Sequence, residues 1–381
     1  MNTTETLKPA IRHAGHQMTE AQAHAKMTSY IEACRNKAAA TLTSIRDVVP
    51  TDRVISANAL DFDGGEDRPL EYITPQGTRE RLHRNALSQL SSRLEIPMAY
   101  VDHLQAAPWG KAFLAKTLAE HVEHSPDKYL IRSVGGEARA VLSDKFRRID
   151  CRPGALALLE SAQAAGLIVT DGSFTDTRST LKFIKPQVLE VFPGEYMVFG
   201  FDWGNSDYGR GASDLRLFFF RAWCWNGAVG ESVVRQIHIG KRLQEDVEYS
   251  RETLEADARA SALALRDAAT YAMSDAKVTR MIEGIRAANE TPIDPKNRVE
   301  SLKKVLTKGE IEQVVTAFNS PDVENMPAGN TLWRWSNAIS WVGGHDVEDA
   351  DRRIDFERLA GDVMKPVMPV MPVAPAPASA A

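Results

Sequence analysis

The stretch from Asp202 to Gly227 constrains the fold more than any other part of the chain. It opens with a polar, glycine-rich turn, NSDYGRG, and continues into the apolar run LRLFFFRAWCW before an Asn-Gly pair ends it. A continuous apolar, aromatic run between turn residues is typical of a strand buried on both faces. We therefore expect a core strand here, with the preceding loop as the place for a site.

The segment 126–242 is rich in strand signals. A Gly-Gly turn at 135–136 predicts a hairpin, and a helix is expected after it, from Arg152 to Ala165. Further strands are expected around two polar turns, Asp171-Gly172 and Pro193-Gly194. Because these strands come in a run and do not alternate with helices, the sequence predicts an α+β fold with an antiparallel sheet core.

The composition divides the whole chain into five regions. They are a flexible arm at 1–20, a mostly helical N-terminal region at 21–125, the α+β core at 126–242, a helical C-terminal region at 243–362 and a disordered Pro/Ala tail at 363–381. Within the C-terminal region, NTLWRWSNAISWV (330–342) predicts a helix that Asn330 caps and that is apolar on two sides. A helix of this kind lies in a core or between subunits.

The total charge does not favour nucleic acid, because 46 Lys and Arg stand against 51 Asp and Glu, a net charge of −5. The segment 128–242 differs, with 16 Lys and Arg against 12 Asp and Glu, so it carries +4 and the rest of the chain −9. A basic middle between acidic flanks is compatible with a surface that faces phosphate. Scattered, solvated charges would give the same counts and remain the alternative.

Three cysteines, Cys34, Cys151 and Cys224, are widely spaced and form no CxxC pair, which favours a reducing compartment. The N-terminal residues lack a basic flank followed by an apolar core, so they do not resemble a signal peptide. No run approaches the about 18 apolar residues that a membrane span needs. We expect a cytoplasmic protein with no membrane partner.

Motifs for nucleotide binding and catalysis are missing from the sequence: it contains no GxxxxGK[ST], GxGxxG, HExxH or GxSxG. We therefore assign no catalytic residue, metal ligand or cofactor. The glycine-rich loop could still hold a metal–phosphate ligand through its backbone N–H groups and a carboxylate. The residues of this alternative ligand loop are Asn205, Ser206, Asp207, Gly209 and His238.

Basic residues are interleaved with aromatic ones in the middle of the chain. Alternate residues of a strand share a face, so Arg178 and Lys182 are expected to point the same way. Cations that hold a phosphate backbone and aromatic rings that stack on bases are features of single-strand binding proteins. The predicted nucleic-acid-binding residues are Arg139, Lys145, Phe146, Arg147, Arg148, Arg178, Lys182, Tyr208 and Arg210.

Four motifs together resemble one family. They are ARAVLSDKFRRID (138–150), NSDYGRGASDLRLFFFRAWCWNG (205–227), HIG (238–240) and TLWRWSNAISWVGGH (331–345). Their order resembles the phage/plasmid-like family called domain of unknown function 932, with Phe146 where that family usually has Tyr. The resemblance implies a phage, prophage or plasmid setting, and hence a bacterial host cytoplasm. By analogy only, hairpin, helix and antiparallel strands are similar to the layout of phage single-strand annealing proteins.

These observations lead us to expect a non-catalytic, homo-oligomeric DNA-binding protein that handles single-stranded DNA in recombination or replication. One alternative is a nucleotide- or metal-dependent enzyme with its site in the loop 202–211. Another is a phage assembly or host-interaction protein that uses the helix around Trp333 and Trp341 as a subunit contact.

Overall fold

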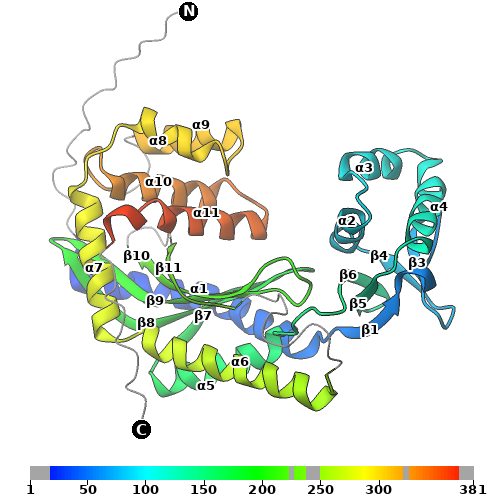
Figure 1. The fold of residues 1–381 in the computed structure, drawn as a ribbon. Helices are drawn as coiled ribbons and strands as arrows, with labels where there is room; N and C mark the ends of the chain where they lie inside the picture. Colours follow the sequence, from blue (N-terminus) through cyan, green and yellow to red (C-terminus); the bar gives the residue numbers. More distant parts are fainter. Residues whose placement is uncertain (1–17, 223–226, 237–248, 321–325, 369–381) are drawn as a thin grey trace, which may run out of the picture.

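The computed structural model describes residues 18–222, 227–236, 249–320 and 326–368. In these residues the chain forms two bodies, each built around its own sheet (Figure 1). All strand pairs but one are antiparallel, and helices precede and follow the strands in sequence. The predicted α+β class with an antiparallel core and helical terminal regions is confirmed. No helix in the described ranges is long and apolar enough to cross a membrane.

The six-stranded body spans residues 51–143. Its strands are β1 (Thr51–Ser56), β2 (Asp61–Gly65), β3 (Arg68–Ile73), β4 (Arg79–Leu82), β5 (Lys128–Val134) and β6 (Glu137–Ser143). Its helices are α2 (Arg84–Arg93), α3 (Met98–Ala106) and α4 (Gly110–Glu123). The strand order is β1-β5-β6-β4-β3-β2, and the pair β4–β6 is parallel. Apolar residues such as Leu87, Leu90 and Leu118 join the helices to the sheet.

The five-stranded body contains the other sheet. Its strands are β7 (Ile168–Phe174), β8 (Ser179–Phe192), β9 (Glu195–Asn205), β10 (Ser213–Arg221) and β11 (Gly227–Gln236), in the order β11-β10-β9-β8-β7. The described part of the aromatic run forms β10, which pairs with a strand on each side. Leu217 and Phe219 enter one apolar cluster, while Phe218 and Phe220 enter another. The expectation of a strand buried on both faces is therefore confirmed for β10.

Helices cover both faces of the five-stranded sheet. On one face α1 (Glu20–Asp47) packs through residues such as Met27 and Tyr30, and the Tyr30 ring lies 4.5 Å from that of Phe220. On the other face lie α5 (Cys151–Ala164) and α6 (Arg251–Ala272). The remaining helices are α7 (Asp275–Glu290), α8 (Pro295–Leu302), α9 (Lys308–Asn319), α10 (Leu332–His345) and α11 (Ala350–Asp362).

The predicted two-sided helix is α10. Its cap is Thr331 and not Asn330, because the Thr331 hydroxyl accepts a hydrogen bond of 3.2 Å from the Arg334 backbone N–H. Trp333 and Trp335 are 1% and 0% exposed, so α10 is a core helix of this chain. Trp333 therefore packs inside this chain, and the alternative of an assembly or host-interaction protein that uses this helix as a subunit contact stays a prediction.

One predicted region boundary also differs from the structure. The region 21–125 contains β1 to β4 besides its helices, and the hairpin β5–β6, expected in the core 126–242, joins their sheet instead of the later strands. The reason is long-range pairing: β1 lies beside β5, with Thr51 opposite Ser133. Short strands with exposed charged residues, such as RERL in β4, have a local pattern that is too weak to predict a sheet.

Candidate functional site

The loop between β9 and β10 lies at the junction of the two bodies. The backbone carbonyl of Tyr208 accepts hydrogen bonds from Asn85 (3.1 Å) and Gln89 (2.8 Å), both in α2. The carbonyl of Asp207 accepts another, of 2.7 Å, from Arg132 in β5. The loop predicted as a site therefore connects the two sheets.

The side chains of the alternative ligand loop have partners inside the protein. Asn205 donates to the carbonyl of Ile149 at 2.7 Å. The Ser206 hydroxyl donates to the carbonyl of Thr177 (2.6 Å) and accepts from the Arg210 N–H (2.9 Å). Both side chains are buried, and these bonds fix the shape of the turn.

Asp207 caps a helix. Its Oδ1 accepts a hydrogen bond of 2.7 Å from the N–H of Cys151, the first residue of α5, whereas the cap residue Asp150 makes no side-chain cap bond. Burial, followed by the nearby charge of Asp150, raises the pKa of Asp207 to about 6. An acid that titrates near neutral pH can serve in catalysis. The Asp207 carboxyl, however, also caps the N-terminal end of α5.

Gly209 is required by the geometry of the loop. Its φ of +72° lies in the left-handed region, and a Cβ on it would meet Leu142 Cδ2 at 2.6 Å. The Phe146 ring lies against the same position, at 3.7 Å from that Cβ. His238, the remaining member of the alternative ligand loop, is outside the described residues. A ligand role for this loop stays a prediction.

Several predicted phosphate-binding cations form ion pairs within the protein. Arg147 makes two hydrogen bonds to Asp257 in α6, of 2.6 and 2.8 Å. Arg148 binds Asp52 in β1 at 2.6 Å. A phosphate group could reach these guanidinium groups only by displacing the carboxylates. In the described structure these two arginines therefore connect the segment after β6 to α6 and to β1.

Lys182 belongs to a row of charges that crosses the five-stranded sheet. The strand register places it opposite both Asp171 in β7 and Asp202 in β9, and Asp202 opposite Arg216 in β10. Above the row, Glu357 of α11 binds the Lys182 ammonium at 2.5 Å. Burial alone would lower the pKa of Lys182, but the charges of Glu357 and Asp171 outweigh it and raise that pKa.

The sequence interpretation missed the acidic members of this row. A signal for it is present, because Lys182, Asp202 and Arg216 each stand between two apolar residues within a strand. A charge at such a position faces a covered sheet surface and needs a partner there. The Oδ2 atom of Asp202 is buried without a hydrogen-bond partner among the described residues.

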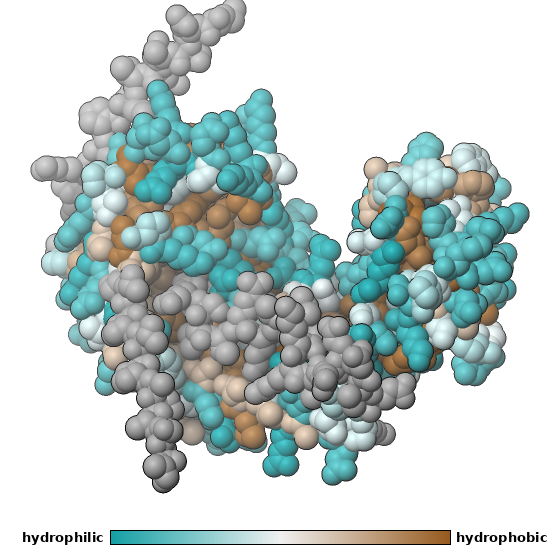
Figure 2. Space-filling view, viewed as in Figure 1, coloured by the Kyte–Doolittle hydropathy of each residue, from teal (hydrophilic) through white to brown (hydrophobic). Residues whose placement is uncertain are grey.

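The other predicted residues gather where the two bodies meet. The Arg139 guanidinium lies 5.7 Å from the centre of the Tyr208 ring and pairs with Asp176 at 3.0 Å. Tyr208 and Phe146 pack in one small apolar cluster. Arg178, just before β8, lies 3.5 Å from Asp355 of α11. Figure 2 shows a wide opening between the two bodies, with hydrophilic residues along much of both sides.

Lys145 and Arg210 are exposed at this junction. Neither side chain forms an ion pair within the described ranges. Within the same ranges, no group of three or more His, Cys, Asp or Glu side chains is placed to hold a metal ion. The junction therefore offers cations and aromatic rings, without a described metal centre.

Comparisons of the chain with protein-family models, curated proteins and solved structures give no match. The resemblance to the phage/plasmid-like family therefore stays a prediction.

Proposed function

We propose that the protein binds single-stranded DNA, without catalysing a reaction on it, where its two bodies meet. The observation that carries this proposal is the position of Lys145 and Arg210. Both cations are exposed and make no ion pair with the described residues. They stand on two segments that touch, because the Phe146 ring lies against Gly209. A phosphate backbone that passes this point would meet both charges.

Two neighbouring arginines can add contacts to the same backbone. Arg139 pairs with Asp176, which is 61% exposed, and also lies 3.4 Å from Glu137, while Arg178 pairs with the exposed Asp355. Because Asp176 and Asp355 are open to water, their attraction to the arginines is screened and a phosphate can replace either carboxylate. The set that we assign to direct contact is therefore Arg139, Lys145, Arg178 and Arg210.

The remaining predicted residues are better suited to support. Arg147, Arg148 and Lys182 hold carboxylates inside the protein, and Tyr208 is 4% exposed. Contact with DNA would then be mainly with phosphates and would depend little on base sequence.

The biological setting of the proposal rests on the resemblance of motifs. It includes phage or plasmid recombination or replication, a homo-oligomer and the cytoplasm of a bacterial host. The enzyme alternative is less well supported, because Asn205, Ser206 and Asp207 each make hydrogen bonds within the protein.

Charge reversal tests the proposal. The logarithm of the binding constant for a labelled oligo-dT should fall linearly with the logarithm of the salt concentration. The double variant Lys145→Glu with Arg210→Glu should reduce the slope of that line by about one for each lost phosphate contact. The matched control is Lys296→Glu with Lys304→Glu, which makes the same charge change at exposed positions in and just after α8. The proposal fails if the unmodified protein shows no salt-dependent binding, or if both double variants lose affinity equally.

A further inference from the structure

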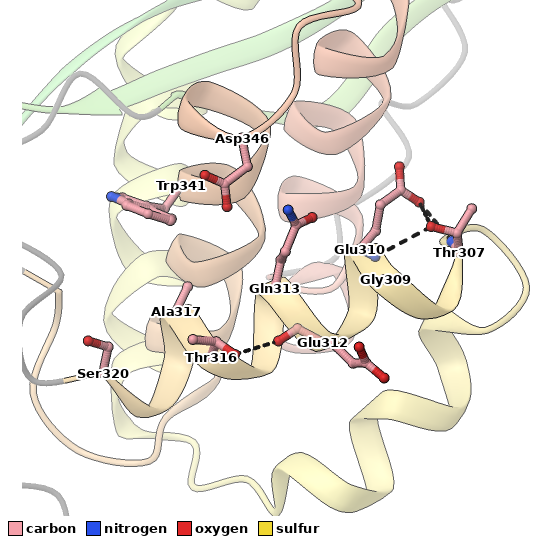
Figure 3. Close-up of a pocket in the computed structure, with 10 residues that line it drawn as sticks. All are labelled: Thr307, Gly309, Glu310, Glu312, Gln313, Thr316, Ala317, Ser320, Trp341 and Asp346. Atoms are coloured by element: carbon pink, nitrogen blue, oxygen red, sulfur yellow. Dashed lines mark hydrogen bonds between the residues drawn. The ribbon is translucent and has the colours of Figure 1, made fainter.

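A pocket of about 680 Å³ lies between α9 and the C-terminal end of α10. Sites for small ligands typically measure about 300–1,000 Å³, so this volume is ample for a ligand group. Figure 3 shows Gln313 of α9, Trp341 of α10 and Asp346 just after α10 around the same space. None of the residues predicted from the sequence to bind DNA lines this pocket.

Trp341 provides a fixed aromatic surface for the pocket. Its ring stacks on that of His345, with centroids 4.6 Å apart and planes 12° from parallel. His345 Nδ1 also lies 2.9 Å from the Trp341 carbonyl oxygen, which holds the imidazole in place. Trp341 lines the pocket and His345 does not, so the imidazole covers one indole face while another part of the ring borders the pocket.

The lining is acidic. It includes Glu310, Glu312 and Asp346, and no Lys, Arg or His is among the described residues that form it. Arg352 binds Glu310 at 2.7 and 2.8 Å, so that carboxylate is already engaged. Lys308 lies 3.9 Å from Glu312, but both side chains are largely exposed and their attraction is screened.

Asp346 is the acid best placed for a ligand. It follows α10 directly, where the last carbonyl groups of the helix add negative potential to that of the carboxylate. It forms no ion pair with any described residue. An indole face beside an uncompensated carboxylate attracts an organic cation and repels phosphate.

We propose that this pocket binds the cationic side chain of an extended basic peptide from a partner protein. The guanidinium or ammonium group lies against the part of the Trp341 ring that borders the pocket and pairs with Asp346, and the Gln313 side-chain carbonyl accepts one of its N–H groups. The pocket follows α9 from Thr307 to Ser320, and a groove of this length suits an extended chain. The site is separate from the proposed DNA contact and does not depend on it.

Calorimetric titration with acetylated tetra-arginine amide tests this inference on the full chain. Trp341→Leu removes the aromatic face, and Asp346→Asn removes the charge with little change in volume. We expect each to weaken peptide binding at least fivefold. Glu348→Gln is the matched control, because it removes an exposed acid two residues further on that does not line the pocket, and it should bind as the unmodified protein does.

Three outcomes overturn the proposal. The first is no peptide binding by the unmodified protein. The second is an equal loss in Asp346→Asn and Glu348→Gln, which would indicate diffuse charge attraction. The third is binding of spermine, but not of the peptide, with the same dependence on Trp341, which would assign the site to a free polyamine. Asp346→Asn keeps the test valid if Trp341→Leu fails to fold.

Discussion

Arg132 and Asp150 are joined by two hydrogen bonds, of 2.7 and 3.0 Å, that tie β5 of the six-stranded body to the start of α5 in the five-stranded body. Arg132 also binds Asp52 at 2.8 Å and the carbonyl of Asp207 at 2.7 Å. The guanidinium thus joins its own strand to three other segments of the chain. Its side chain is 2% exposed, so its charge depends on these partners.

Arg132→Met should therefore lower the free energy of unfolding by about 3–5 kcal/mol, the usual loss when one partner of a buried ion pair is removed. Arg148→Met is the control, since Arg148 binds the same Asp52 but is more exposed, at 24%. That change should cost no more than about 1 kcal/mol. Urea denaturation measures both, and equal losses would contradict the role assigned to Arg132.

Asp207 should make stability depend on pH. Its folded pKa of about 6 exceeds the ordinary value of 3.8, so the native state holds its proton more tightly. The stabilisation from this proton is complete below about pH 4 and is lost as the pH rises through 6. Asp207→Asn keeps an oxygen to accept the Cys151 N–H and carries no buried charge.

The variant should consequently gain stability relative to the unmodified protein between pH 4 and 7, by on the order of 3 kcal/mol for a shift of this size. Denaturation at a series of pH values measures the difference. Asp67→Asn, which makes the same change at an exposed position, is the matched control. A flat difference for Asp207→Asn would mean that its carboxyl is not shifted.

Gly209→Ala should destabilise the junction. The new methyl group would lie 2.6 Å from Leu142, at a φ of +72° that an L residue adopts only with strain. Strain of this kind costs about 1–3 kcal/mol. Gly211→Ala, two residues later, meets nothing within 4 Å and should change stability by no more than about 0.5 kcal/mol. Thermal unfolding compares the two variants, and similar melting temperatures would refute the argument.

Lys182 and Glu357 should behave as a coupled pair. Lys182→Met leaves the Glu357 carboxylate without the ammonium that lies 2.5 Å away, and Glu357→Gln leaves that ammonium with Asp171, at 3.8 Å, and with Asp202 on the neighbouring strand. The two single variants together should lose more unfolding free energy than the double variant does. The difference, which is the coupling energy, should be about 0.5–3 kcal/mol. Simple additivity in a double-mutant cycle would argue against the pair.

The same Lys182→Met variant bears on the proposed function. If Lys182 only supports the sheet, its loss should leave the salt slope of oligo-dT binding unchanged, at a temperature where the variant is folded. A slope reduced by about one would instead place a phosphate contact at Lys182.

The parts of the fold that follow from local patterns were predictable. An unbroken apolar run predicted β10, and apolar residues on two sides of a helix predicted the burial of α10, because both signals lie within a few neighbouring residues. The division of the strands into two sheets was not predictable in this way. It depends on pairs such as Thr51 with Ser133, which no local period encodes.

The candidate site shows the same limit. Arg147 and Lys182 look like available cations in the sequence, but their acidic partners, Asp257 and Glu357, lie 110 and 175 residues away. Composition shows how many charged residues a segment carries, but it does not show which of them form ion pairs within the protein. Lys145 and Arg210 differ from the other predicted cations in their exposure and in making no ion pair with the described residues, and the fold decides both properties.

The position of α1 on the five-stranded sheet has a consequence for the order of events during synthesis. This helix ends at Asp47, yet the first strand of the sheet that it covers begins at Ile168. At about 5–20 residues per second, a ribosome needs roughly ten seconds to make the intervening chain, in which the six-stranded body is completed first. Met27 and Tyr30 have no sheet to pack against in that interval. The first helix to be made thus stays uncovered while α2 to α4 are already buried in the six-stranded body, and it is the segment that we expect a chaperone to shield.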